Sequence, residues 1–265
     1  DSLKNEAYNL ISEGKEAEII NAYAQAEKKY FKSIEIWNQI SEYDEYRAYP
    51  YYSLALLYRK MGNYQKSLEN YNFAEKILLN SREEYKFLLS AIYSSIGDYF
   101  VDIGDYTKAM KYFESAIKVI EYSKERNESV FCGIQINIAQ TFYYQHKYQK
   151  AIDVCNNYIN SKNSIDHNRF EWIIGSSFIA LGKYDEAKKI LEKSLTGLND
   201  QPERYTEAFL ITTKAYIRAG ELVIAEKYLN KAIPLLATNK AQNDPWHIYY
   251  YELKSEFLKR KAAKE

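Results

Sequence analysis

Residues 104–116 read GDYTKAMKYFESA, and their spacing returns along most of the chain. A turn residue is followed two places later by a bulky residue, and then by small and bulky residues at helical intervals. Further strong copies begin at Gly62, His146, Gly182 and Gly220, and a weaker copy begins at Tyr23. The bulky residue falls at positions 23, 64, 106, 148, 184 and 222, so the steps are 41, 42, 42, 36 and 38 residues. The chain is therefore an internal repeat.

A second periodic run precedes each strong copy, as in Tyr93, Ile96, Gly97 and Phe100. Apolar residues at intervals of three and four mark the buried face of a helix. Each unit is thus predicted to be a helix A and a helix B joined by a tight turn. We expect the small eighth residue of helix A, such as Gly97, to face the small residue Ala109 of helix B. A single hairpin cannot cover its own apolar face, so the hairpins are predicted to stack.

These offsets resemble the tetratricopeptide repeat consensus over roughly residues 17–236. The units are longer than the usual ~34 residues and are similar to those of kinesin light chains and of bacterial regulators and sensor kinases. The resemblance implies an all-α fold, a right-handed superhelical solenoid of about six hairpins in a single domain, 1–265. Repeats are expected at about residues 1–42, 43–81, 82–124, 125–162, 163–200 and 201–240, with 241–265 as a further repeat's start or a capping helix.

Charge and hydropathy exclude several classes of partner. Lys and Arg number 36 and Asp and Glu also 36, which argues against a nucleic acid or a polybasic membrane contact. No apolar run approaches the ~18 residues of a membrane span, and no leader precedes the repeats. Cytoplasm and periplasm both stay open as compartments. Because the chain begins at Asp1 and its last run, Trp246 to Lys264, has no helix B after it, we expect a segment of a longer protein.

Motifs that would indicate catalysis or metal binding do not occur in the sequence. The histidines His146, His167 and His247 lie in different repeats, and no Cys-x2-Cys pair is present. His146 stands where other units have a turn glycine and is interpreted as a turn residue. Cys132 and Cys155 are expected in the core. No enzyme activity, metal or cofactor is predicted.

Two further expectations concern the ends of helices and the many tyrosines. Asp200-Gln201-Pro202 and Asn243-Asp244-Pro245 have the composition of helix starts. Seven tyrosines occupy consensus packing places and are expected in the core: Tyr58, Tyr64, Tyr71, Tyr106, Tyr148, Tyr184 and Tyr216.

A stripe of helix A places 2, 5, 9, 12 and 13 lines the concave groove in tetratricopeptide proteins, and the resemblance implies that a peptide binds there. Aromatic anchors flanked by fixed charges suit an extended peptide or a partner helix. Burial of Trp172 between repeats stays an alternative to its exposure in the groove. The Lys-and-Asn clamp with which some relatives hold a chaperone's C-terminal carboxylate is not matched. The groove candidates are Tyr52, Arg59, Asp98, Gln140, Tyr143, Tyr144, Trp172, Ser176, Lys214 and Arg218.

The sequence favours a non-catalytic scaffold for a protein or peptide, with no nucleic-acid or membrane contact, as the interaction or sensory segment of a larger bacterial regulatory protein. One alternative is a peptide-controlled regulator of a response-regulator phosphotransfer pathway. Another is a structural module that self-assembles, for example as a homodimer, through its C-terminal helix. Apolar surface is expected to be exposed on that helix at Trp246, Tyr249, Tyr250, Tyr251 and Phe257.

Overall fold

In the part of the chain that it describes, the computed structural model contains α-helices and a short 3₁₀ helix, η1 (Glu45–Arg47). It describes residues 2–40, 44–79, 82, 85–121, 128–159, 167–196, 202–238 and 245–264, and within these ranges it contains no strand. The predicted all-α class is confirmed. Among the helices of these ranges, none combines the length and the apolar character needed to cross a bilayer.

The chain divides into two compact units, residues 1–137 and 138–265, and the boundary falls within α7. The helices before the boundary are α1 (Ser2–Ile19), α2 (Tyr23–Gln39), α3 (Ala48–Lys60), α4 (Tyr64–Leu78), α5 (Lys86–Asp102) and α6 (Tyr106–Glu121). From the boundary onwards they are α7 (Glu128–Tyr144), α8 (Tyr148–Tyr158), α9 (His167–Ala180), α10 (Tyr184–Thr196), α11 (Pro202–Ala219), α12 (Leu222–Thr238) and α13 (Pro245–Ala262).

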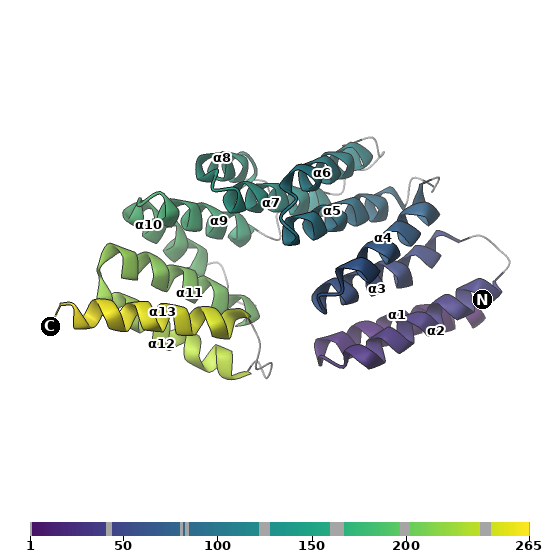
Figure 1. Ribbon diagram of the computed structural model, residues 1–265, viewed down its shortest axis with the longest axis horizontal. Helices are drawn as coiled ribbons and strands as arrows, with labels where there is room; N and C mark the ends of the chain where they lie inside the picture. The colour runs from purple at the N-terminus through teal and green to yellow at the C-terminus, as the bar shows by residue number, and fades with distance from the viewer. Residues whose placement is uncertain are drawn as a thin grey trace. The chain divides into compact units, whose positions relative to one another are not determined.

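Helical hairpins are the building element of both units. In the first unit α1 packs on α2, α3 on α4 and α5 on α6, and each hairpin contacts the next one (Figure 1). In the second unit α9 packs on α10 and α11 on α12, while α13 lies against both α11 and α12. Helix α11 also contacts α9, so the A helices α9, α11 and α13 follow one another through α11.

In every hairpin, the turn between helix A and helix B contains one residue with a left-handed backbone conformation. The backbone φ angle is 80° at Gly104, 59° at His146 and 59° at Asn21, and Gly62, Gly182 and Gly220 also have positive values. After this residue a backbone N–H donates to the carbonyl five residues back, as from Asp105 to Phe100 at 2.8 Å. These bonds satisfy carbonyls that the end of helix A leaves without partners. The interpretation of His146 as a turn residue is confirmed.

The helices of a hairpin approach each other where glycine occupies the eighth place of helix A. A Cβ at Gly97 would lie 2.4 Å from the ring of Phe113, and one at Gly175 would lie 2.5 Å from the Leu191 side chain. The nearest neighbours of these glycines are thus bulky side chains of helix B, and the expected contact between Gly97 and Ala109 stays a prediction. The Phe113 ring is fully buried, and it occupies the space that a side chain at position 97 would fill. Because protein interiors are closely packed, only glycine fits at this position.

Most of the predicted core is buried, although the tyrosine expectation was too broad. Tyr58, Tyr71 and Tyr216 are buried, but Tyr64 is 38% exposed, and the prediction for Tyr64 was wrong. Tyr64 opens helix B at the end of its hairpin, where fewer neighbours cover the ring. Tyr106, Tyr148 and Tyr184 open their B helices too and are half-buried.

Both cysteines are buried in the core, as expected. Burial raises the pKa of the Cys155 thiol to about 12. Within the described residues, no group of three or more His, Cys, Asp or Glu side chains is placed to hold a metal ion.

More of the apolar surface of α13 is buried than the sequence indicated. The predicted face of Tyr250, Leu253 and Phe257 is buried against α11 and α12. The expectation of exposed Tyr250 and Phe257 was therefore wrong, whereas Tyr251 is exposed as expected. The helices α11 and α13 begin at the predicted prolines, Pro202 and Pro245, while the capping candidates at 200–201 and 243–244 lie outside the described residues.

Candidate functional site

In the first unit, the candidate groove residues neutralise one another. The Arg59 guanidinium on α3 donates from Nε to Asp102 Oδ2 at 2.5 Å and lies 3.8 Å from Asp98 Oδ2, both on α5. Partial burial disfavours the charge, but the bond to Asp102 and the charge of Asp98 raise the pKa of Arg59 above its ordinary value. The Tyr52 hydroxyl lies 3.1 Å from Ser95 Oγ. These partners leave little unmet charge on this stripe.

The cavity described in the first unit lies elsewhere, among α2, α4 and the start of α3. It has a volume of about 350 Å³ and contains none of the candidate groove residues. Its lining consists of Ile34, Trp37, Asn38, Arg47, Tyr51, Phe73, Lys76 and Ile77.

The second unit brings the candidate residues together in a cleft of about 430 Å³, the aromatic cleft. Helices α7, α9, α11 and α13 all contribute residues to it. The candidates Gln140, Tyr143, Tyr144, Trp172, Ser176 and Lys214 lie in its wall. Its other residues are Arg169, Ile173, Glu207, Ile211, Trp246 and Tyr249.

A second cleft of about 330 Å³ adjoins the first, because both contain Tyr143, Ser176, Lys214 and Tyr249. We call it the cationic cleft, since its charged side chains among the described residues are Lys214 and the candidate Arg218. The rest of its lining is Tyr148, Ile179, Ala180 and Tyr184. Seven of the ten candidates thus line two adjoining clefts of one unit, whereas Tyr52, Arg59 and Asp98 belong to the other unit.

Trp172 forms the floor of the aromatic cleft instead of projecting into it. The residue is 4% exposed and packs in a core cluster with Leu191 and Ile211. Its indole N–H donates to Ser194 Oγ at 3.2 Å. The structure thus favours the alternative that Trp172 is buried between repeats. Tyr144, by contrast, is 50% exposed at the rim.

Lys214 is a half-buried ammonium in the wall shared by the two clefts. Its Nζ lies 5.5 Å from the centroid of the Tyr249 ring, a cation–π distance. Among the described residues no carboxylate oxygen lies within 4.0 Å of this nitrogen. Burial, and secondarily the charge of Arg218, lower the pKa of Lys214, while Glu256 and Glu252 act in the opposite direction. The protein thus holds a positive charge in this cleft with little compensation.

Arg218 is held by α13. Its Nε lies 3.0 Å from Glu256 Oε1, and the same oxygen lies 3.1 Å from Nε of Arg260. Glu256 is therefore shared between two guanidinium groups and is not paired with Lys214.

Four tyrosines line the cationic cleft together with Lys214 and Arg218: Tyr143, Tyr148, Tyr184 and Tyr249. Burial, followed by the charges of nearby groups, raises the pKa of Tyr143 and of Tyr249. Their hydroxyls therefore stay protonated at neutral pH and can donate hydrogen bonds. The Tyr143 ring lies 5.4 Å from that of Tyr148, whose hydroxyl lies 2.7 Å from His146 Nδ1.

Sequence reasoning missed the contributions of α13 and of the residues that open helices B. Trp246 and Tyr249 both precede the buried Tyr250 on α13. An aromatic pair spaced by three residues beside a core face is the signal that could have found them. Tyr148 and Tyr184 were assigned to the core, yet both are half-buried and line the cationic cleft.

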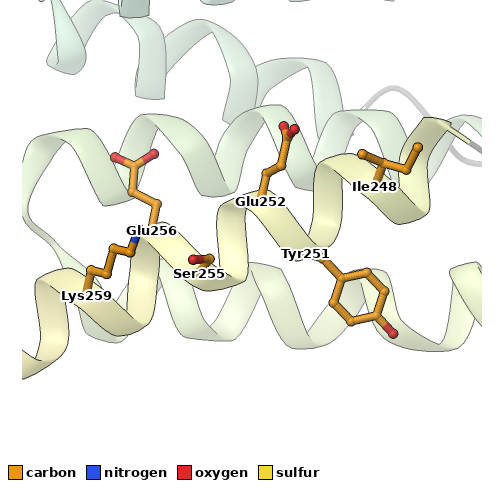
Figure 2. Close-up of a pocket in the computed structure, with 6 residues that line it drawn as sticks. All are labelled: Ile248, Tyr251, Glu252, Ser255, Glu256 and Lys259. Atoms are coloured by element: carbon orange, nitrogen blue, oxygen red, sulfur yellow. The ribbon is translucent and has the colours of Figure 1, made fainter.

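The outer face of α13 repeats the same stripe without a following helix in the described chain. Counting from Tyr250 as the fourth place, the stripe places include Ile248, Tyr251 and Ser255. Figure 2 shows these side chains on one helix, with Glu252 and Glu256 extending to one side and Tyr251 to the other. All six residues labelled in Figure 2 come from α13, so this surface is an open face and not an enclosed site.

Comparisons with solved structures identify similar folds at low sequence identity. Over 96% of this chain, Cut9 in the APC/C hetero-tetramer Cut9-Hcn1 is similar with a TM-score of 0.66 and 15% identity, and the match spans 43% of the Cut9 chain, less than half its length. NprR, solved in complex with its cognate peptide NprX, matches 98% of this chain and 74% of its own, with a TM-score of 0.64 and 17% identity. The apo form of RapI matches 97% of this chain and 99% of its own, with a TM-score of 0.65 and 14% identity.

Comparison at the level of sequence families identifies the repeat directly. No curated protein sequence matches the chain. Two family models, both described as tetratricopeptide repeat, match residues 46–121 and 172–196. The first match spans the hairpins α3–α4 and α5–α6, and the second spans most of α9–α10. Residues 46–121 and 172–196 are therefore identified as tetratricopeptide repeats.

Proposed function

We propose that the chain is a non-catalytic scaffold that binds a peptide or protein segment in the two adjoining clefts of its second unit. The observation behind this proposal is the convergence of seven groove candidates from α7, α9 and α11 on these clefts. Concave sites lined by aromatic side chains with a few placed polar groups are the usual form of a ligand site. The similarity in fold to NprR, solved with its cognate peptide, supports the proposal.

The proposal extends to the cellular role. Such a scaffold suits the interaction or sensory segment of a larger bacterial regulatory protein, in which ligand binding to the repeats controls another module. A regulator of phosphotransfer that responds to a peptide is one form of this role.

The test is selection from a peptide pool. The purified chain is incubated with random peptides, and retained peptides are assayed by thermal shift, because a ligand that binds only the folded state raises the melting temperature. Tyr144→Ala combined with Gln140→Ala should raise the Kd of the peptide at least about tenfold, which corresponds to ~1.4 kcal/mol of binding free energy. Both side chains lie at the cleft and outside the buried core.

A matched control is Tyr251→Ala, a tyrosine that is 63% exposed on α13 and lies outside both clefts. This variant should bind the retained peptides as the parent chain does. Retention of no peptide, or equal binding by the cleft variant, contradicts the proposal.

Self-association through α13 is a second candidate function. Ile248, Tyr251 and Leu258 are exposed on this helix, and apolar surface of this kind is frequent at interfaces between copies. Deleting residues 244–265 would also remove Trp246 and Tyr249 from the aromatic cleft, so a point substitution is the cleaner test. Sedimentation equilibrium should show a dimer that Tyr251→Glu converts to a monomer, and a parent chain that is monomeric at high concentration contradicts this function.

A further inference from the structure

The two clefts differ in chemistry, and this difference indicates which peptides fit. The aromatic cleft has a largely apolar wall formed by Trp172, Ile173, Ile211 and Trp246, with Tyr144 at the rim. Among the described residues, the cationic cleft has Lys214 and Arg218 as its charged groups and no carboxylate in its lining.

Lys214 lines both clefts, and among the described residues no carboxylate lies within ion-pair distance of its ammonium. A half-buried ammonium loses hydration, and it regains that free energy only from an opposite charge or hydrogen-bond acceptors. Its ammonium lies over the Tyr249 ring, and it shares the lining of the cationic cleft with Arg218, Tyr143 and Ser176. The acids near it are Glu252 and Glu256 of α13, and Glu256 is shared by Arg218 and Arg260.

The hydroxyl groups around Lys214 suit an anion as well. Tyr143, Tyr148, Tyr184 and Tyr249 line the cationic cleft with Ser176. Phenolic hydroxyls that stay protonated donate hydrogen bonds, and a carboxylate with two oxygens accepts several at once. Glu207 lies in the aromatic cleft and is absent from the lining of the cationic one, although its charge acts on Tyr249, which lines both.

We infer that the second unit binds a peptide segment in which a carboxylate stands beside a large apolar side chain, with the carboxylate at Lys214 and Arg218 and the apolar side chain over Trp172. The four residues shared by the two clefts require the two groups to be neighbours in the ligand. The carboxylate belongs either to an Asp or Glu side chain or to a free C-terminus. This inference rests on the proposed scaffold function and specifies its ligand.

The experiment uses two pools of random hexapeptides with acetylated N-termini. One pool is amidated at the C-terminus and the other has a free carboxylate. Affinity selection with the whole chain, followed by mass spectrometry, should enrich Asp or Glu next to Phe, Trp or Leu about tenfold over the input in the amidated pool. In the other pool, enrichment of a terminal apolar residue without an internal acid identifies the C-terminal carboxylate as the source.

Variants test the assignment of the anion to Lys214. Lys214→Met should abolish the enrichment of acids and retain that of apolar residues. Replacing the acid of the best peptide by its amide should weaken binding to the parent chain about tenfold or more, and to Lys214→Met hardly at all. The control Lys231→Met removes a lysine of α12 that also lies over tyrosine and phenylalanine rings but lines neither cleft, and its selection should match that of the parent chain.

The outcomes separate the two proposals. The carboxylate inference is overturned if peptides are retained with neither an acid enriched in the amidated pool nor a terminal apolar residue enriched in the free-carboxylate pool. It is also overturned if the enrichment persists in Lys214→Met. Either result leaves the scaffold function standing. Failure to retain peptides from either pool overturns both. Removing a half-buried, uncompensated ammonium should not lower the melting temperature of Lys214→Met, and a fall there would mean that Lys214 serves the fold and not a ligand.

Discussion

Both units have charged residues on the same stripe of helix A, but the cations Arg59 and Lys214 differ in their pairing with carboxylates. In the first unit Arg59 on α3 is paired with Asp98 and Asp102 on α5. In the second, Lys214 on α11 lies in a cleft with no carboxylate within ion-pair distance among the described residues. A stripe position therefore indicates where a ligand-binding residue can lie. Whether its charge can pair with a ligand depends on the side chains of the neighbouring repeat.

The fifth place of helix A shows the same contrast for aromatic residues. Tyr52 in the first unit is half-buried with a hydroxyl partner on α5, whereas Trp172 in the second is part of the core beneath the aromatic cleft. Four experiments test how far this difference between the units extends.

Replacement of Trp172 has the largest expected effect. Trp172→Ala should cost about 3–5 kcal/mol of folding free energy, because it leaves a cavity beside Leu191 and removes the indole N–H that donates to Ser194 Oγ. Urea unfolding measures the loss, and Trp172→Phe should recover part of it. A cost below about 1 kcal/mol would show that the indole projects into the cleft as an anchor.

Ligand binding should protect the second unit more than the first. Cys132 lies in the first unit and Cys155 in the second, and both are buried. At about ten times Kd, a peptide held in the clefts stabilises the closed state by ~1.4 kcal/mol. Labelling of Cys155 in a Cys132→Ala chain should then slow about tenfold, and labelling of Cys132 in a Cys155→Ala chain should change less. Equal protection of both thiols would mean that the units open together.

Removal of stripe cations should affect the two units with opposite sign. Arg59→Met breaks two partly exposed ion pairs and should cost about 0.5–1 kcal/mol. Lys214→Met should be neutral or stabilising, since it removes a desolvated charge with little compensation. Thermal unfolding at low and high salt measures both, and the Arg59 effect should shrink in high salt. An equal loss in both variants would remove the distinction between the units.

The turn residues should give changes of about the same small size as the stripe cations. Gly104→Ala, in the first unit, forces a Cβ into a left-handed position and should cost about 1 kcal/mol. His146→Gly, in the second, relieves the same strain and should stabilise by a few tenths to 1 kcal/mol. The loss of the His146–Tyr148 hydrogen bond offsets part of this gain. Urea midpoints of the two variants should move in opposite directions.

Much of the fold and part of the site follow from the spacing of a few residues. The glycines at 62, 104, 182 and 220 predicted the turns, and His146 could be assigned to the same role because its neighbours kept the phase. The stripe predicted seven lining residues of the clefts. Trp246 and Tyr249 could not be placed in the same way, because their role depends on α13 packing beside α11.

The local sequence determined that the chain forms helical hairpins with defined turns and apolar faces, because the helical period and the left-handed turn act over a few residues. The tertiary structure decided which side chains meet between hairpins. Arg59 and Asp102 are 43 residues apart, and only the packing of α3 on α5 brings their charges together. The packing of α13 on α11 likewise pairs Arg218 with Glu256 and leaves Lys214 to face the cleft. Charge compensation depends on distances of a few ångströms through space, and repeat periodicity carries no information about those distances.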